Sequence, residues 1–213
     1  MSVRAEVIRC DSRGSLRCGF SSTSGIWARP GLRGGFGKSV LLDAADERAV
    51  REGFAVLGAR GHASEADLAW SAATEALGDL VAGGHAAALP AVQREALDAA
   101  LAGGPAPGPI EPGAVLAGAL GVLRAAATSR PVLLVVDDVQ WVDEPSRLLV
   151  EFVARRCERL HLTVLVAGRE DPDRPAPVAT TMLEPLDRGA SRRLLDEAGV
   201  TSPAVTQTVT SPR

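Results

Sequence analysis

The pattern of hydrophobic and polar positions changes several times along the chain, and each change predicts an element. From Lys38 to about Arg51 the apolar positions Val40, Leu41, Ala44, Ala45 and Val50 recur with a helical period, which predicts an amphipathic helix. The same period predicts helices over residues 64–81, 90–101, 114–128, 144–159 and 188–198. Short, continuously apolar runs predict strands over residues 54–59, 132–136 and 160–167, with an edge strand over 181–186.

Three of these helices carry finer expectations. The first residues of the 64–81 helix, Ser-Glu-Ala-Asp, predict an N-cap at Ser64 and an acidic first turn. Pro90 is expected at the first position of its helix. The 144–159 helix should turn four side chains inward, namely Leu148, Leu149, Phe152 and Val153.

Strands that are apolar throughout are typical of a parallel sheet buried on both faces, and here they alternate with helices. The fold class is therefore predicted as α/β, layered, with a mostly parallel sheet. Residues 1–30 have neither period and are rich in Ser, Arg and Gly, so we expect an irregular segment whose best strand candidate is 25–28. The folded domain is placed at 31–199, and the Thr/Ser/Pro-rich residues 200–213 are expected to be a disordered tail.

Composition adds an asymmetry and several exclusions. The chain has 213 residues, of which 46% are hydrophobic and 3% aromatic, so the core should consist of Leu, Val and Ala. Its net charge of −3 gives no general reason to bind nucleic acid or a membrane. However, residues 1–37 are net basic and the remainder is net acidic, as if two kinds of sequence were joined. No apolar run reaches the ~20 residues of a membrane span and no signal peptide is visible, so a cytoplasmic protein is expected.

The three cysteines, Cys10, Cys18 and Cys157, do not form a disulfide framework and are expected to be free thiols. The three histidines share no metal-ligand spacing and are expected to be surface or core residues.

A glycine-rich loop leads directly into the first predicted helix. Glycines let backbone N–H groups curl around a phosphate, and the helix N-terminus presents unpaired N–H groups to the same anion. Lys38 is the only lysine in the chain, and at this place it would reach the β- and γ-phosphates while Ser39 ligates Mg²⁺. The candidate cofactor-binding residues are Gly34, Gly35, Phe36, Gly37, Lys38 and Ser39.

This loop departs from the pattern G-x-x-x-x-G-K-[ST] at one place. Its first glycine should fall at position 32, which is Leu32, and the nearest glycine is Gly31. The alternative to a phosphate-binding loop is a glycine-rich turn that caps a helix beside a surface lysine.

A second signal is the strand over 132–136, which ends in Asp137 and Asp138. Ligands of open α/β sheets sit at the carboxyl ends of the strands, so two acids there suit a Mg-nucleotide site. Asp137 would bind the metal and Asp138 would orient or deprotonate the attacking water. Arg169 follows the next strand and would sense the γ-phosphate or stabilise transition-state charge. The alternative is a strand that ends in a solvated Asp-Asp turn beside a surface arginine. Trp141 is expected to pack rather than to contact a ligand.

Several segments then run in the order of one known family: GGFGKSVLLDAA, FAVLGARGHASEADLAW, LPAVQREALDAAL, RPVLLVVDDVQWVDEPSRLLVEFVARR, LTVLVAGRED and LEPLDRGASRRLL. Over residues 34–198 the chain resembles the ATPase module of large LuxR-type bacterial transcriptional regulators, an AAA-like P-loop class. Its most specific piece is DD-x-Q-W-x-D at residues 137–143. The family's Walker A residues match Lys38 and Ser39, its Walker B acids match Asp137 and Asp138, and its arginine after the next strand matches Arg169.

The resemblance implies a P-loop NTPase-like fold that binds ATP and Mg²⁺ and hydrolyses ATP slowly, as a conformational switch. The full regulators continue into a helical sensor region and a C-terminal helix-turn-helix domain, neither of which is visible here. The expected partners are therefore ATP and ADP, with no membrane and no direct nucleic-acid binding, and with self-association or separate sensor and helix-turn-helix regions left open.

At its front the family has an apolar strand directly before the phosphate loop, and residues 1–33 do not match it. A scrambled or mis-started front would explain the charge asymmetry, the missing strand and Leu32 together. The module is then incomplete at both ends, and two functions compete. One is a weak regulatory ATPase, favoured by Lys38, Ser39 and the two acids, and the other is a non-catalytic remnant that binds nucleotide weakly or not at all.

Overall fold

The computed structural model describes residues 3–9, 38–103, 108–157, 160–169, 180–183 and 189, with side chains from residue 41 to residue 169 apart from the gaps. In chain order the elements are β1 (Val3–Arg9), α1 (Lys38–Arg51), β2 (Ala55–Arg60), α2 (Ser71–Ala82), α3 (Ala91–Leu101), α4 (Pro112–Ser129), β3 (Val132–Asp137), the 3₁₀ turn η1 (Val139–Trp141), α5 (Glu144–Ala154), β4 (Leu162–Arg169) and β5 (Thr180–Leu183).

The strands form a single sheet in the order β2-β3-β4-β1-β5. β2, β3 and β4 are parallel neighbours, whereas β1 runs antiparallel to both β4 and β5. The α/β architecture with parallel strands predicted from the apolar runs is confirmed.

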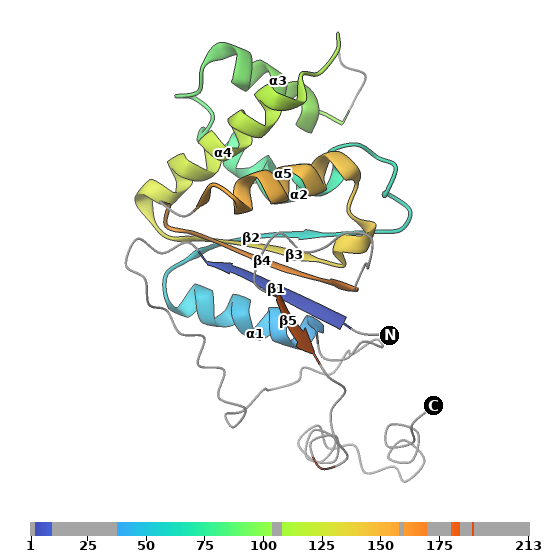
Figure 1. Cartoon of the computed structure of the whole chain (residues 1–213). Coiled ribbons are helices and arrows are strands. Elements are labelled where there is room, and N and C mark those ends of the chain that lie inside the picture. The colour runs from blue at the N-terminus through green and yellow to red at the C-terminus, as the bar shows by residue number, and fades with distance from the viewer. Residues whose placement is uncertain are drawn as a thin grey trace.

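Helices cover both faces of the sheet. Figure 1 shows α1 beneath it and α2, α4 and α5 above it, with α3 on the outer side of α4. Each layer has its own core, because the side chains of a strand alternate between faces. Along β3, Val132, Leu134 and Val136 join the large core under α2, α4 and α5, whereas Leu133 and Val135 join the smaller one against α1.

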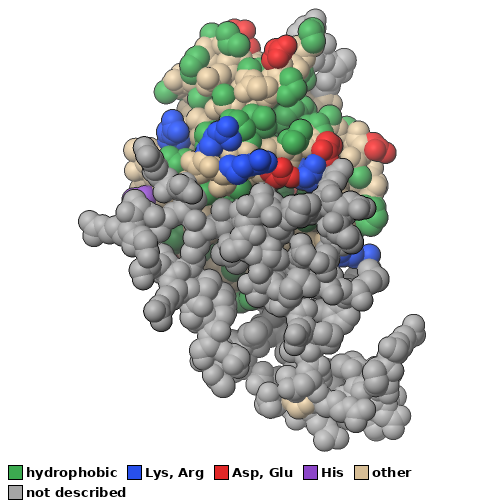
Figure 2. All heavy atoms as spheres, in the orientation of Figure 1, with side chains coloured by type: hydrophobic (Ala, Val, Ile, Leu, Met, Phe, Trp, Pro, Cys, Tyr) green, Lys and Arg blue, Asp and Glu red, His purple; other side chains and the backbone are tan. Residues whose placement is uncertain are grey.

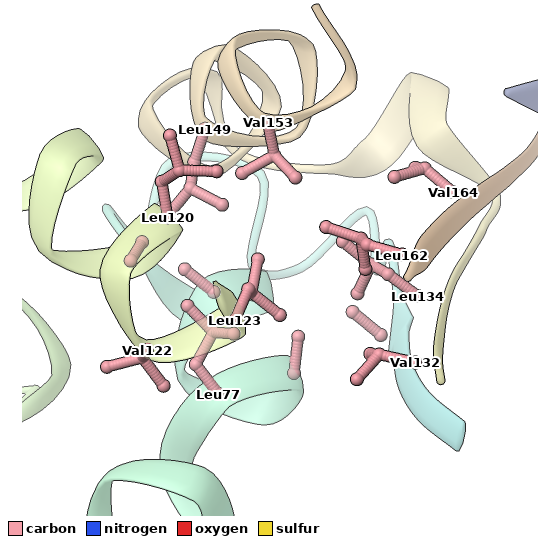
Figure 3. Close-up of a cluster of buried hydrophobic side chains, with 14 of the residues drawn as sticks. Leu77, Leu120, Val122, Leu123, Val132, Leu134, Leu149, Val153, Leu162 and Val164 are labelled. Atoms are coloured by element: carbon pink, nitrogen blue, oxygen red, sulfur yellow. The ribbon is translucent and has the colours of Figure 1, made fainter. Parts of the chain in front are cut away.

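The large core consists almost wholly of Leu, Val and Ala, as the composition predicted. In Figure 3, Leu77 of α2, Leu120 and Leu123 of α4, and Leu149 and Val153 of α5 meet the side chains of β3 and β4. β3 is buried at every position from Val132 to Val136, and this burial fixes its direction and register. Its last residue, Asp137, therefore has a fixed position at the sheet edge. α4 is long and apolar enough by composition to cross a membrane, but here it packs as the core helix between α3, α5 and the sheet.

The expectation of an irregular segment over residues 1–30 is wrong for residues 3–9, which form β1. From Val3 to Val7 apolar and charged residues alternate, which is the period of a half-buried strand, so a short strand signal was present in this segment. Pairing with β4 on one side and β5 on the other supplies the hydrogen bonds of the strand. β1 is therefore part of the sheet, although the domain predicted from the sequence began only at residue 31. The strand candidate at 25–28, the tail 200–213 and most of the predicted 188–198 helix lie outside the described residues.

The direction of β1 matters for the phosphate loop. Val3 pairs with Arg169 at the carboxyl edge of the parallel strands, and Arg9 pairs with Thr163 near the amino edge. α1 ends just before β2 begins, and its 14 residues span about 21 Å at the usual rise, so its first residue returns to the carboxyl edge. Figure 1 shows the last residue of β1 and the first residue of α1 at opposite ends of the parallel strands. β1 therefore does not run directly into α1, as the strand before a phosphate loop does.

One helix, α1, buries a different face from the one predicted, and a second, α5, buries the predicted face except at one position. In α1 the inward side chains are Leu42 and Ala49, whereas Val50 is 63% exposed. In α5, Leu149 and Val153 are buried and Phe152 packs against the core, but Leu148 is 44% exposed. The outer side of α5 carries ion pairs, in which Arg147 contacts Glu144 and Glu151. Figure 2 shows basic and acidic side chains gathered across this helical layer. Periodicity located these helices, but their rotation depends on what they pack against.

Three helix ends and one cysteine also differ from expectation. α2 begins at Ser71 rather than Ser64, because the residues before it form turns, and Pro90 is the N-cap of α3 rather than its first residue. α5 ends at Ala154 rather than at residue 159. Cys157 is fully buried and disulfide-bonded to a residue outside the described part of the chain, so the prediction of free thiols is wrong for Cys157.

Candidate functional site

The carboxyl edge of the parallel strands brings several predicted site residues together. β3 ends in Asp137, β4 ends in Arg169, and α1 begins at Lys38 with Ser39 as its second residue. Because α1 returns to this same edge, its unpaired N–H groups and the positive end of its dipole face the side of the sheet where the acids lie. The glycine-rich residues Gly34–Gly37, and the side chains of Lys38 and Ser39, lie outside the described residues.

The two acids form a compact pair. The backbone N–H of Asp138 donates to Oδ1 of Asp137 at 2.8 Å, and the two side chains are 28% and 14% exposed, respectively. Asp138 has φ 50° and ψ 45°, a left-handed conformation that Asp tolerates better than most residues. This backbone turn holds both carboxylates, each partly exposed, at the sheet edge.

Arg60 supplies a cation to this pair, although neither its spacing nor its neighbours in the sequence mark it as a site residue. It is the last residue of β2 and pairs in register with Asp137. Its Nη2 lies 3.3 Å from Oδ2 of Asp137 and 3.6 Å from Oδ2 of Asp138. The available signal was that two of the predicted strands, over 54–59 and 132–136, are followed by residues of opposite charge, Arg60 and Asp137.

A glutamine ties the acids to the next strand. Nε2 of Gln140 donates to Oδ1 of Asp138 at 3.0 Å, and Oε1 of Gln140 accepts from the backbone N–H of Arg169 at 2.9 Å. A carboxylate can only accept and an N–H can only donate, so these two partners fix which way the amide points. Asp138 and the end of β4 are thus joined through one side chain, although the structure brings only the backbone of exposed Arg169 to this contact.

Two glycines make room for this turn on its two sides. A Cβ at Gly61 would lie 2.4 Å from the carbonyl oxygen of Asp138, and one at Gly168 would lie 2.5 Å from Cγ1 of Val139. The backbone N–H of Gly61 also donates to the carbonyl oxygen of Asp137 at 2.9 Å. Gly61 and Gly168 therefore leave the space in which the turn over residues 138–142, called here the acid turn, lies between β2 and β4. Trp141, at the end of this turn, is 41% exposed and is not a core residue.

Behind the turn, Asp143 fixes the two helices that flank it. Its side chain is 2% exposed and accepts from the backbone N–H groups of Trp70, Ala72 and Ser146 at 2.8, 3.2 and 3.0 Å. One carboxylate thus caps the N-termini of both α2 and α5, which explains why α2 starts at Ser71 and not at Ser64. The hydroxyl of Ser146 adds a further acceptor for the N–H of Ala73 at 2.9 Å. The DD-x-Q-W-x-D segment therefore builds the acid turn and its support together.

On the other face of the sheet, α1 carries an acid with a perturbed pKa. Burial raises the pKa of Asp46 above its usual range, and the neighbouring Asp43 raises it further. Its Oδ1 is buried without a hydrogen-bond partner among the described residues. Because the folded pKa lies above the unfolded one, the ionised carboxylate costs stability as the pH rises from about 3.9, the usual Asp value, through the raised pKa.

The acid pair also fits a divalent cation. Carboxylate oxygens are the ligands that Mg²⁺ prefers, and it is bound through one or two of them rather than by a full protein cage. Asp137 and Asp138 already hold a positive group within 3.6 Å. Within the described residues, no group of three or more His, Cys, Asp or Glu side chains forms a richer metal cluster.

A mostly parallel α/β sheet, with acids at its carboxyl edge and a helix N-terminus returning to that edge, defines a P-loop NTPase-like domain. Comparison with family models agrees: the model described as AAA ATPase domain matches residues 33–166, more than half of the chain. The chain therefore belongs to the AAA ATPase domain family, a class of nucleotide-binding ATPase modules. No curated protein and no solved structure matches it.

Proposed function

We propose that this chain binds Mg-ATP at the carboxyl edge of its sheet and hydrolyses it slowly, as the regulatory switch of a LuxR-type transcriptional regulator. The observation that carries the proposal is the acid pair, held half-buried by the 138–142 turn at the edge to which the N-terminus of α1 returns. The LuxR-type context rests on the order of the sequence segments described above and on the DD-x-Q-W-x-D segment.

The residues divide the work as follows. The backbone N–H groups of Gly34–Gly37 would cradle the phosphates, and Lys38 would neutralise the β- and γ-phosphates. Ser39 and Asp137 would hold Mg²⁺, whose charge would offset that of the triphosphate. Asp138 orients the attacking water, and Gln140 keeps that carboxylate turned toward the edge. Arg169 supplies positive charge from the end of β4.

A specific observation favours the second candidate, a remnant that binds nucleotide weakly or not at all. β1 ends at the edge opposite the start of α1, so no described strand carries the phosphate loop directly into its helix. A loop without that anchor loses pre-organisation of its N–H groups, which lowers phosphate affinity. The two candidates therefore differ in affinity rather than in the location of the site.

Asp138→Asn tests the proposed reaction. The amide keeps the shape and the acceptor for Gln140 but cannot take a proton from water, so we expect ATP affinity within about threefold of wild type and turnover reduced by about a hundredfold or more. Calorimetry measures the affinity and phosphate release measures the turnover. Asp98→Asn, an exposed position on α3, is the matched control and should change neither. Equal turnover in Asp138→Asn would contradict the assignment of the base, and a wild-type chain that binds no ATP would favour the remnant.

A further inference from the structure

We propose that Arg60 is a built-in counter-ion that occupies the cation position of the acid pair, and that a divalent metal must displace it to enter. The inference rests on the proposed function, because it concerns the same metal site. It adds a residue that sets how readily the metal binds.

The guanidinium of Arg60 lies where a metal ion bound to both acids would lie. A single nitrogen, Nη2, faces Oδ2 of both Asp137 and Asp138, at 3.3 and 3.6 Å. The other carboxylate oxygens of the pair are used locally, since Oδ1 of Asp137 accepts from the N–H of Asp138 and Oδ1 of Asp138 accepts from Gln140. Oδ2 of each acid thus faces the same guanidinium nitrogen, as both oxygens would face a shared metal ion.

The backbone of Arg60 is held on two sides, so its position is a property of the fold. Its N–H donates to Oε2 of Glu75 on α2 at 2.9 Å, and the N–H of Gly61 donates to the carbonyl oxygen of Asp137. The side chain reaches the acids from this fixed base and is 53% exposed. It can therefore leave toward water while its backbone stays in place.

The difference in burial decides which partner moves when a metal ion replaces Arg60. The carboxylates of Asp137 and Asp138 are much less exposed than Arg60, so they remain at the edge when the guanidinium leaves. Metal entry thus requires breaking both Arg60 contacts, and the metal affinity of the chain is lower than the acids alone would give.

The test is binding of Mn²⁺ alone, without nucleotide, measured by the loss of the free-ion signal in electron paramagnetic resonance. Arg60→Gln removes the charge but keeps the backbone N–H that bonds Glu75, so we expect about tenfold tighter Mn²⁺ binding than in wild type. Arg60→Lys keeps a cation and should stay near the wild-type affinity.

Two controls separate this effect from a change in net charge. Arg155→Gln removes another exposed, ion-paired arginine, 2.8 Å from Glu151 on α5, and should leave Mn²⁺ affinity unchanged. Adding Asp137→Asn to Arg60→Gln should abolish the gain. Affinity in Arg60→Gln that is equal to or weaker than wild type, or a gain that survives Asp137→Asn, would overturn the proposal. Since the assay holds no nucleotide, a failure of ATP binding leaves its result readable.

Discussion

Asp143→Ala should lower the free energy of unfolding by about 4 kcal/mol, because it leaves three backbone N–H groups without their acceptor in a water-excluded place. These groups belong to Trp70, Ala72 and Ser146, at the N-termini of two helices. A side-chain cap is ordinarily worth about 1 kcal/mol, but it serves one helix and is solvated. Here one carboxylate, 2% exposed, serves α2 and α5 together.

Urea denaturation with linear extrapolation measures this change. Asp98→Ala removes an exposed carboxylate from α3 and should change stability by less than about 0.5 kcal/mol. Asp143→Asn retains one acceptor oxygen and should fall between wild type and Asp143→Ala. A loss below about 1 kcal/mol in Asp143→Ala would show that water or another group satisfies these N–H groups, against the double cap.

Gly61→Ala should cost about 2–3 kcal/mol, since the added methyl group meets backbone rather than a movable side chain. Its Cβ would lie 2.4 Å from the carbonyl oxygen of Asp138 and 2.8 Å from the backbone C of Trp141 and N of Val142. The turn that carries the acids can yield only by moving away from β2, which would also separate Arg60 from Asp138.

Gly58→Ala is the matched control, in the same strand, because no atom lies within 4 Å of the position that its methyl group would take. Alanine loses less backbone freedom on folding than glycine, so the control should be neutral or stabilising by up to about 1 kcal/mol. The midpoints of thermal unfolding of Gly61→Ala and Gly58→Ala, measured under the same conditions, test this difference in stability. Equal midpoints would contradict the close packing of Gly61 beneath the acid turn.

The parts of the fold that local sequence determines were predictable. The helix from Lys38 to Arg51 has the predicted limits and the buried strand ending at Asp137 has them to within one residue, because a helical period and an unbroken apolar run are short-range signals. The meeting of Asp137, the end of β4 and the start of α1 at one edge followed from the parallel arrangement. Their chemical roles stay predictions.

The features that were missed depend on distant partners. Asp143 caps a helix whose first turn lies more than 70 residues earlier, so no window around Ser64 or Ser71 reveals it. Arg60 becomes part of the site only because β2 lies beside β3 in register. β1 carries a short alternating pattern of its own, but its place between β4 and β5 and its reversed direction depend on those two neighbours. In each case the deciding contact is tertiary.

If the N-terminus of α1 and the acid pair converge on one Mg-triphosphate, substitutions at either place should weaken the same binding event. Calorimetric titration of ATP with Mg²⁺ into wild type, Lys38→Ala, Asp137→Asn and the double variant measures this, with Arg48→Ala at the far end of α1 as the control. We expect each single substitution to weaken binding by about tenfold or more, and Arg48→Ala to change nothing. The double variant should lose less affinity than the sum of the two single losses, because both groups hold the same ligand. An ATP affinity in Lys38→Ala equal to that of wild type would contradict this convergence.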